Sequence, residues 1–185
     1  MTSATPILVA TLLALQEQSV SPGLTLLMLI ASVMTHAGCN LTNDYFDSIR
    51  GLDSVQTHGA GGTVHAGHIT SDDLQAITIS FSLALLLALP VMISIGWIVP
   101  VIALFAAGVA FFYTAGRYPL AYNRMDEVGG FLALGVAMVC GNYYVHAGTL
   151  TGTAFALSCS IGLYAAAILH AKTCEMLRST ANMAR

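Results

Sequence analysis

The sequence predicts an all-α protein that spans a membrane. Of its 185 residues, 56% are hydrophobic and only 8% are charged, and the mean hydropathy is +0.77. Apolar runs that approach the length of a bilayer-spanning helix, about 20 residues, recur along the chain, and the charges gather between them. This composition excludes an ordinary soluble domain. Because no basic stripe is present, we expect no nucleic-acid partner.

Six apolar segments predict six helical spans in an integral-membrane bundle. The segments cover residues 5–16, 22–40, 74–94, 97–116, 128–146 and 152–171. The first is short for a full crossing and lacks the basic region and cleavage site of a signal peptide. We therefore expect it to be a span whose first residues are missing. Pro90 and Pro100 flank the turn at Gly96, and membrane helices tolerate proline where neighbours satisfy the freed carbonyls.

The basic residues predict the orientation in the membrane. All of them follow an even-numbered span: Arg50, Arg117, Arg124, Lys172, Arg178 and Arg185. By the positive-inside rule these loops are cytoplasmic. Eight of the nine acids share that side, and only Glu17 does not. We expect an integral protein of a bacterial or archaeal plasma membrane, with its active face cytoplasmic and with lipid around its spans.

A cluster of carboxylates follows the second span, in the stretch NDYFDSIRGLD. Asn43, Asp44 and Asp47 lie within one helical turn, and Asp53 can join them only if the helix ends near Gly51. Mg²⁺ takes one or two carboxylates and completes its shell with water and phosphate oxygens. The cluster therefore predicts a Mg²⁺ site for a diphosphate substrate. The alternative interpretation is a solvated helix cap.

The loop after this cluster is rich in glycine and histidine. Gly61 and Gly62 offer backbone that can approach a phosphate, although a plain polar turn explains them equally well. The three histidines of the loop match no zinc-ligand spacing: His58, His65 and His68.

The second cytoplasmic loop reads YTAGRYPLAYNRMDE. Arg117 can hold a phosphate through its charged fork. The tyrosines Tyr113, Tyr118 and Tyr122 are candidates for substrate binding, or else belong to the aromatic belt at the membrane surface. Glu127 opens the next span and is a further candidate.

These motifs resemble a known family. NLTNDYFDSIRGLD is similar to the first aspartate-rich motif of the UbiA superfamily of intramembrane prenyltransferases. The spacing of its last Asp, followed by a Gly-Gly turn and AGHIT, resembles the branch that prenylates 1,4-dihydroxy-2-naphthoate in menaquinone synthesis. YTAGRYPLAYNRMDE and GNYYVHAG resemble the later loop and span of that branch. The resemblance runs over nearly the whole chain, up to His170.

The resemblance implies a helical bundle of about nine spans, of which this chain covers roughly the first two-thirds. It also implies transfer of a polyprenyl group from its diphosphate to an aromatic acceptor. An allylic cation forms and the electron-rich ring attacks it, while metal and cationic groups stabilise the departing diphosphate.

The same resemblance implies roles for individual residues. Asp44, Asp47, Tyr113 and Arg117 would be catalytic, the last two as the family's Tyr-x-x-x-Lys/Arg element. The Mg²⁺ ligands would be Asn43, Asp44, Asp47 and Asp53. Substrate would be bound by Asn40, Gly61, Gly62, Tyr113, Arg117, Tyr118, Tyr122 and Glu127.

The chain departs from the family pattern at several places. Thr63 replaces an Arg of many relatives and removes one phosphate contact, and Asp126 replaces the usual Gly before Glu127 and adds a negative charge. The N-terminal Arg-Pro segment and the second aspartate-rich motif are absent. We therefore expect no prenyl transfer by these 185 residues as written.

The tail, residues 172–185, explains the missing motif. The family's sixth span leads into His-Ala-Asn-Asn-Leu-Arg-Asp-x-x-x-Asp-x-x-x-Gly-Lys, whereas this one leads into HAKTCEMLRSTANMAR. The codons CAC GCC AAC AAC CTG CGA GAT encode the expected His-Ala-Asn-Asn-Leu-Arg-Asp. Deleting the C of the first AAC codon gives CAC GCC AAA ACC TGC GAG AT, which encodes His-Ala-Lys-Thr-Cys-Glu and the start of Met. The remaining tail back-translates into the expected residues in the other frame. We hypothesise one transmembrane prenyltransferase-like domain, 1–171, followed by an aberrant, frameshifted tail.

A non-enzymatic membrane protein is the alternative function, for example a cation carrier that uses Asp44, Asp47 and Asp53. Carriers place acids near the middle of the membrane, whereas these acids lie at span ends, which favours catalysis at an interface. Neither the acceptor, the prenyl chain length nor the oligomeric state follows from these residues.

Overall fold

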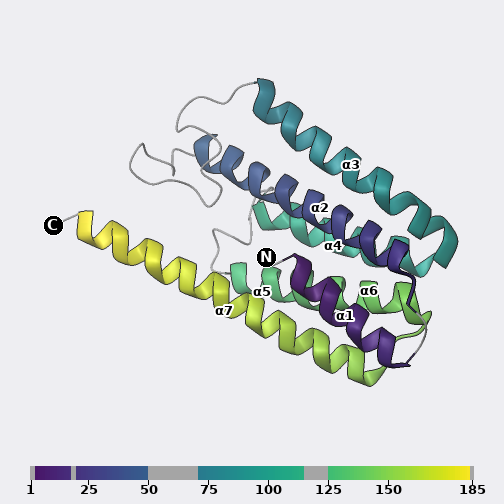
Figure 1. Cartoon of the computed structure of the whole chain (residues 1–185). Coiled ribbons are helices and arrows are strands. Elements are labelled where there is room, and N and C mark those ends of the chain that lie inside the picture. The colour runs from purple at the N-terminus through teal and green to yellow at the C-terminus, as the bar shows by residue number, and fades with distance from the viewer. Residues whose placement is uncertain (1–2, 18–19, 50–70, 115–124, 184–185) are drawn as a thin grey trace. The chain divides into compact units, whose positions relative to one another are not determined.

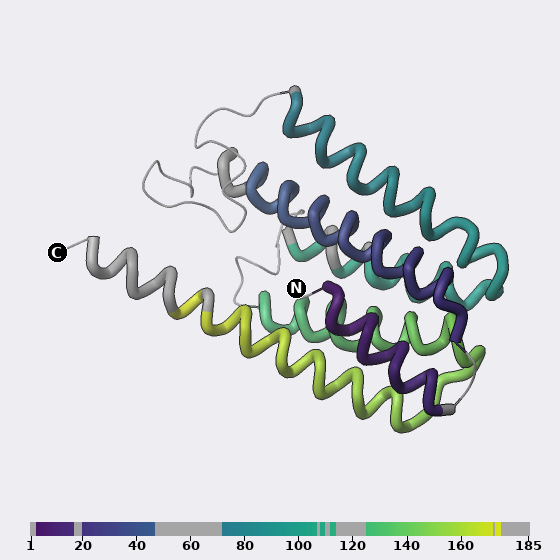
Figure 2. Tube along the Cα trace, in the orientation of Figure 1, coloured from purple at the N-terminus to yellow at the C-terminus, as the bar shows by residue number. Residues whose placement is uncertain are grey.

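The structure is a computed structural model, and it describes residues 3–17, 20–49, 71–114 and 125–183 (Figures 1 and 2). Within these ranges the secondary structure is entirely helical, as the sequence predicts. The helices are α1 (Ala4–Glu17), α2 (Pro22–Ile49), α3 (Ser71–Ile95), α4 (Ile98–Thr114), α5 (Asp126–Gly130), η2 (Phe131–Ala137), α6 (Met138–Ala147) and α7 (Gly152–Met183).

Each predicted span coincides with a helical segment. Four stretches of the described chain are long and apolar enough to cross a membrane: Pro22–Phe46, Asp72–Ile95, Asp126–Ala147 and Gly152–Ala171. The shorter apolar helix Ala4–Gln16 corresponds to the first predicted segment. The prediction of an all-α membrane-spanning fold is therefore confirmed.

Helix α2 extends past the predicted end of the second span at residue 40. It continues to Ile49 through the carboxylates, because no helix breaker occurs before Gly51 and polar residues are tolerated where a helix leaves the membrane. Asn43, Asp44 and Asp47 therefore share a helical backbone, as the sequence predicts.

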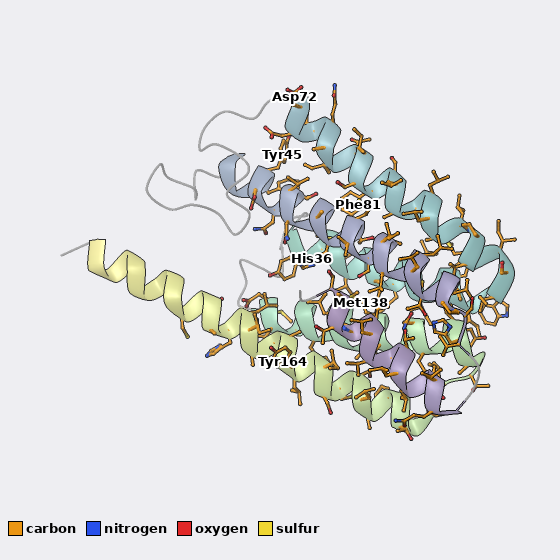
Figure 3. The ribbon with its side chains drawn as sticks, in the orientation of Figure 1. His36, Tyr45, Asp72, Phe81, Met138 and Tyr164 are labelled. Atoms are coloured by element: carbon orange, nitrogen blue, oxygen red, sulfur yellow. The ribbon has the colours of Figure 1, made fainter. Side chains whose placement is uncertain are left out.

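The chain divides into two compact units, which are described separately. Unit 2, residues 21–97, is the antiparallel pair α2 and α3. At Gly38 an added Cβ would lie 3.0 Å from Cε2 of Phe81, so the absence of a side chain lets the ring of α3 lie against α2 (Figure 3). Two threonine hydroxyls of α2 donate to carbonyls one turn earlier, Thr35 to Ala31 at 2.8 Å and Thr42 to Gly38 at 2.7 Å. These bonds satisfy polar groups that lipid cannot satisfy.

Unit 1 comprises residues 1–20 and 98–185. Its buried core is built from small side chains and one tyrosine of α1, α6 and α7: Ala10, Ala14, Val139, Tyr143, Ala147 and Ala154. The fully buried Asn142 ties α1 to α6, because its Nδ2 donates to the Ile7 carbonyl at 2.8 Å and to Thr11 Oγ1 at 2.9 Å. Hydrogen bonds of this kind hold membrane helices together where the hydrophobic effect does not.

The fifth predicted span contains a π-helix between two α-helices. Residues Phe131–Ala137 form η2, flanked by α5 and α6. Sequence periodicity did not predict this segment. Gly148, with φ 69°, ends α6 in the left-handed conformation that glycine adopts without strain.

Helix α7 runs without a break from Gly152 through Lys172 to Met183. The tail hypothesised to be out of frame therefore continues the helix of the sixth span. The division into a domain 1–171 and an aberrant tail stays a prediction.

Candidate functional site

The carboxylate cluster begins on the last turns of α2. Asp44 is buried, with 2% of its surface exposed, although it lies at the end of a membrane span. Asn43 beside it is half-buried and Asn40, one turn earlier, is exposed. A buried carboxylate is costly unless hydrogen bonds or a cation compensate it. Among the described side chains of this cluster, Asp44 is the buried carboxylate.

Aromatic rings flank this end of unit 2. The rings of Tyr45 and Phe46 meet edge to face, with centroids 5.4 Å apart and planes at 88°. Figure 3 shows Tyr45 at the same end of the unit as Asp72, which opens α3 and is exposed. Amphipathic aromatic rings such as that of tyrosine are enriched at the membrane–water interface. The described part of the cluster thus lies at the last residues of the candidate span Pro22–Phe46.

Most of the remaining predicted site residues lie outside the described part of the chain. These are Asp53, Gly61, Gly62, Arg117, Tyr118 and Tyr122, together with the side chain of Asp47. Within the described residues, no group of three or more His, Cys, Asp or Glu side chains could hold a metal ion. The oxygens of Asp44 and Asn43 are nevertheless ligands of the type that Mg²⁺ prefers, so this part of the donor set fits the ion.

A second group of predicted residues lies in unit 1. Tyr113 is half-buried on the last turn of α4, and Glu127 lies on the first turn of α5. Oε1 of Glu127 is 2.9 Å from Nδ1 of His170 on α7. Nε2 of the same ring is 3.6 Å from Sγ of Cys174.

The extra acid of this loop also has a partner. Asp126 is only 8% exposed, and its Oδ2 accepts a hydrogen bond of 2.9 Å from Oγ1 of Thr173. The sequence indicated only an added negative charge at Asp126 and no partner for Glu127 or Asp126 on α7. The available signal was that α5 and α7 belong to consecutive spans, so that the start of one and the end of the next lie on the same side of the membrane.

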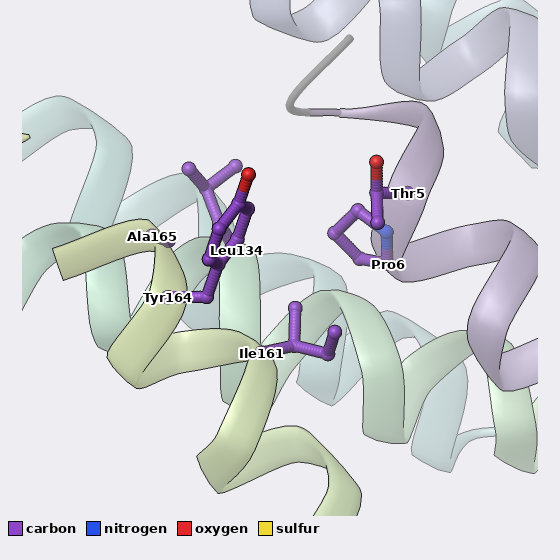
Figure 4. Close-up of a pocket in the computed structure, with 6 residues that line it drawn as sticks. All are labelled: Thr5, Pro6, Leu134, Ile161, Tyr164 and Ala165. Carbon is purple, nitrogen blue, oxygen red and sulfur yellow. The ribbon is translucent and has the colours of Figure 1, made fainter. Parts of the chain in front are cut away.

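A small notch opens in unit 1 between α1, η2 and α7 (Figure 4). Its walls are mostly apolar, and hydroxyls come from Thr5 and Tyr164. The lining residues are Thr5, Pro6, Leu134, Ile161, Tyr164 and Ala165. None of them belongs to the predicted site.

Comparison with known proteins extends over almost the whole chain. The family model described as UbiA prenyltransferase family matches residues 3–183. A 1,4-dihydroxy-2-naphthoate octaprenyltransferase of Bacillus subtilis is 29% identical over 167 residues, which cover 90% of this chain and 54% of the relative. Enzymes of the same name from Mycobacterium leprae and Escherichia coli are 31% and 28% identical, over 79% and 89% of this chain and 50% and 56% of theirs.

The chain thus spans about half the length of the curated relatives that it matches. No solved structure matches it.

Proposed function

The chain belongs to the UbiA prenyltransferase family, and from this membership we propose that the protein transfers a polyprenyl group from its diphosphate to an aromatic acceptor. The acceptor class is that of 1,4-dihydroxy-2-naphthoate, which the names of the relatives contain. The spans keep the isoprenoid in the membrane, and the reaction takes place at the cytoplasmic face, where the acids gather.

The observation that carries the proposal is the burial of Asp44 at the end of a membrane span, 2% exposed. A diphosphate is polyanionic, so a carboxylate can contribute to its binding only through a shared cation. We propose that Asp44, Asn43, Asp47 and Asp53 hold Mg²⁺. The ion would neutralise charge on the leaving diphosphate.

The residues of the tyrosine loop complete the proposed site. Arg117 would pair with diphosphate oxygens through its planar fork, and Tyr113 would donate a hydrogen bond to them. Asn40, Gly61, Gly62, Tyr118, Tyr122 and Glu127 remain proposed substrate contacts. The cation-carrier alternative is not favoured, because the matched relatives are transferases.

The test is a transfer assay on the complete gene product in its membrane. We expect a Mg²⁺-dependent prenylated product from a polyprenyl diphosphate and 1,4-dihydroxy-2-naphthoate. Asp44→Asn should lower the rate about 100-fold or more, because it removes a charge that acts on the leaving group. Asp72→Asn is the matched control, since it makes the same change at an exposed residue of the same unit.

Two results would contradict the proposal. Undiminished transfer by Asp44→Asn would remove Asp44 from the site. Absence of any prenylated product from the unaltered complete protein, with Mg²⁺ and a range of aromatic acceptors, would refute the function itself.

A further inference from the structure

A carboxylate and an imidazole ring from different helices form a dyad in unit 1. Oε1 of Glu127 and Nδ1 of His170 are 2.9 Å apart, and the two side chains are 31% and 68% exposed. A carboxylate in this position accepts a hydrogen bond from Nδ1–H. The neutral ring then carries its lone pair on Nε2. The pair therefore holds the imidazole in the tautomer that can accept a proton.

Nε2 of His170 can accept a hydrogen bond. In the chain as printed, the thiol of Cys174 lies 3.6 Å from this nitrogen. Cys174 belongs to the tail that we hypothesise to be out of frame. A hydroxyl of a bound molecule could approach the same nitrogen, because most of the ring surface is exposed.

The dyad lies where α5 meets α7. In the chain as printed, Thr173 Oγ1 also donates to Oδ2 of the buried Asp126 at 2.9 Å. Glu127 and His170 themselves both precede the tail that we hypothesise to be out of frame. Helix α5 also contacts α4, whose last turn carries Tyr113. The dyad thus lies at the end of unit 1 to which Tyr113 also belongs. A base whose ring is held by a carboxylate is preorganised.

We propose that His170, oriented by Glu127, is the base that takes the hydroxyl proton of the aromatic acceptor. This inference rests on the proposed function. The O–H bond of the acceptor breaks, the proton moves to Nε2, and the electron pair stays on the oxygen. The C–O bond to the diphosphate breaks, the diphosphate leaves with the electron pair of that bond, and an allylic cation remains. The phenolate pushes electron density into the ring, so that a ring carbon bonds to this cation. That ring carbon then loses its hydrogen as a proton and the oxygen regains one, which restores the aromatic hydroxyl compound.

Glu127 stabilises the imidazolium while it holds the proton, since opposite charges then lie 2.9 Å apart. The ring afterwards returns the proton to water, to which it is exposed. His170 would be a catalytic residue and Glu127 a positioning residue.

The experiment compares His170→Gln and His170→Ala with the unaltered complete protein in its membrane. A positioned general base contributes about 100-fold or more, so we expect kcat to fall by about that factor while KM for the polyprenyl diphosphate stays unchanged. Added imidazole should restore part of the activity of His170→Ala. His146→Gln is the matched control, because His146 lies near the end of α6, next to the loop that leads into α7.

A second measurement separates a base from a structural residue. Acceptors with a more acidic hydroxyl need less help from a base, so the loss in His170→Gln should shrink as the acceptor becomes more acidic. Full activity of His170→Gln would overturn the inference. So would a loss that is equal for all acceptors and that imidazole does not restore. Absence of transfer by the unaltered protein would instead refute the proposed function, and this inference with it.

Discussion

Gly135 of η2 and Gly162 of α7 face each other at a distance that leaves no room for a side chain on either. A Cβ added at Gly135 would lie 2.7 Å from the Gly162 nitrogen and 2.8 Å from the Ser158 carbonyl oxygen. A Cβ added at Gly162 would lie 2.7 Å from Cδ2 of Phe131. Small residues at such crossings let membrane helices approach closely.

Replacing Gly135 by Ala should therefore destabilise unit 1. The new methyl group would collide with backbone, which cannot move aside as a side chain can, and overpacking of this kind costs about 1–3 kcal/mol. Thermal unfolding in detergent measures the effect. Gly108→Ala on α4 is the control, because nothing lies within 4 Å of a Cβ there. Equal stability of the two variants would show that the crossing is looser than described.

Replacing Asn142 by Leu should loosen α1 from α6. The change removes both bonds that the amide donates, to the Ile7 carbonyl and to Thr11, and membrane hydrogen bonds are worth about 1–2 kcal/mol each at most. Thr11→Val is the matched control, since it removes only the second bond. We expect cysteine cross-linking or proteolysis to report a larger release of α1 in Asn142→Leu. Identical behaviour of the two variants would contradict a role for the carbonyl bond.

Metal binding to the 185-residue chain should depend on diphosphate. If Asp44 and its neighbours hold Mg²⁺ for a diphosphate, a non-hydrolysable diphosphate analogue should raise the affinity for Mg²⁺ about tenfold or more, because the analogue completes the coordination shell. Calorimetry on the purified chain measures this, with Asp44→Asn as the negative control and Asp72→Asn as the positive one. An affinity for Mg²⁺ that the analogue does not change would instead favour a cation carrier.

The DNA of the gene tests the reading frame of residues 172–185. We expect the other frame to encode Asn-Asn-Leu-Arg-Asp-x-x-x-Asp-x-x-x-Gly-Lys directly after Ala171. We also expect that frame to stay open through further apolar spans. Resequencing from codon 165 onward reads both frames at once. A stop codon early in the other frame would contradict the hypothesis.

The placement of the helices could be predicted because lipid imposes a simple requirement. An uninterrupted apolar run must form a helix to satisfy its backbone, so composition alone located the six helical segments. Asn43, Asp44 and Asp47 could be placed on one helix end from their spacing.

Tertiary contacts decide the features that the sequence did not predict. Glu127 and His170 are 43 residues apart, and nothing local to either residue indicates the contact. The burial of Asp44 depends on what packs around it. The acceptors that Asn142 meets on α1 depend likewise on which helix lies against α6. The tyrosine loop, the glycine loop and the division of domains remain predictions.

The π-helix η2 has a consequence for the tolerance of this span to insertions and deletions. A residue in an α-helix turns the chain by about 100°, and a residue in a π-helix turns it by less, so seven π-helical residues leave α5 rotated against α6 relative to a continuous α-helix. That angular offset determines which neighbour each end meets, with Glu127 directed to His170 and Asn142 to α1. Deleting one residue of Phe131–Ala137 would change the offset by roughly a quarter turn. Homologues that differ in length at this point would thus carry the same polar residues on different faces of the span.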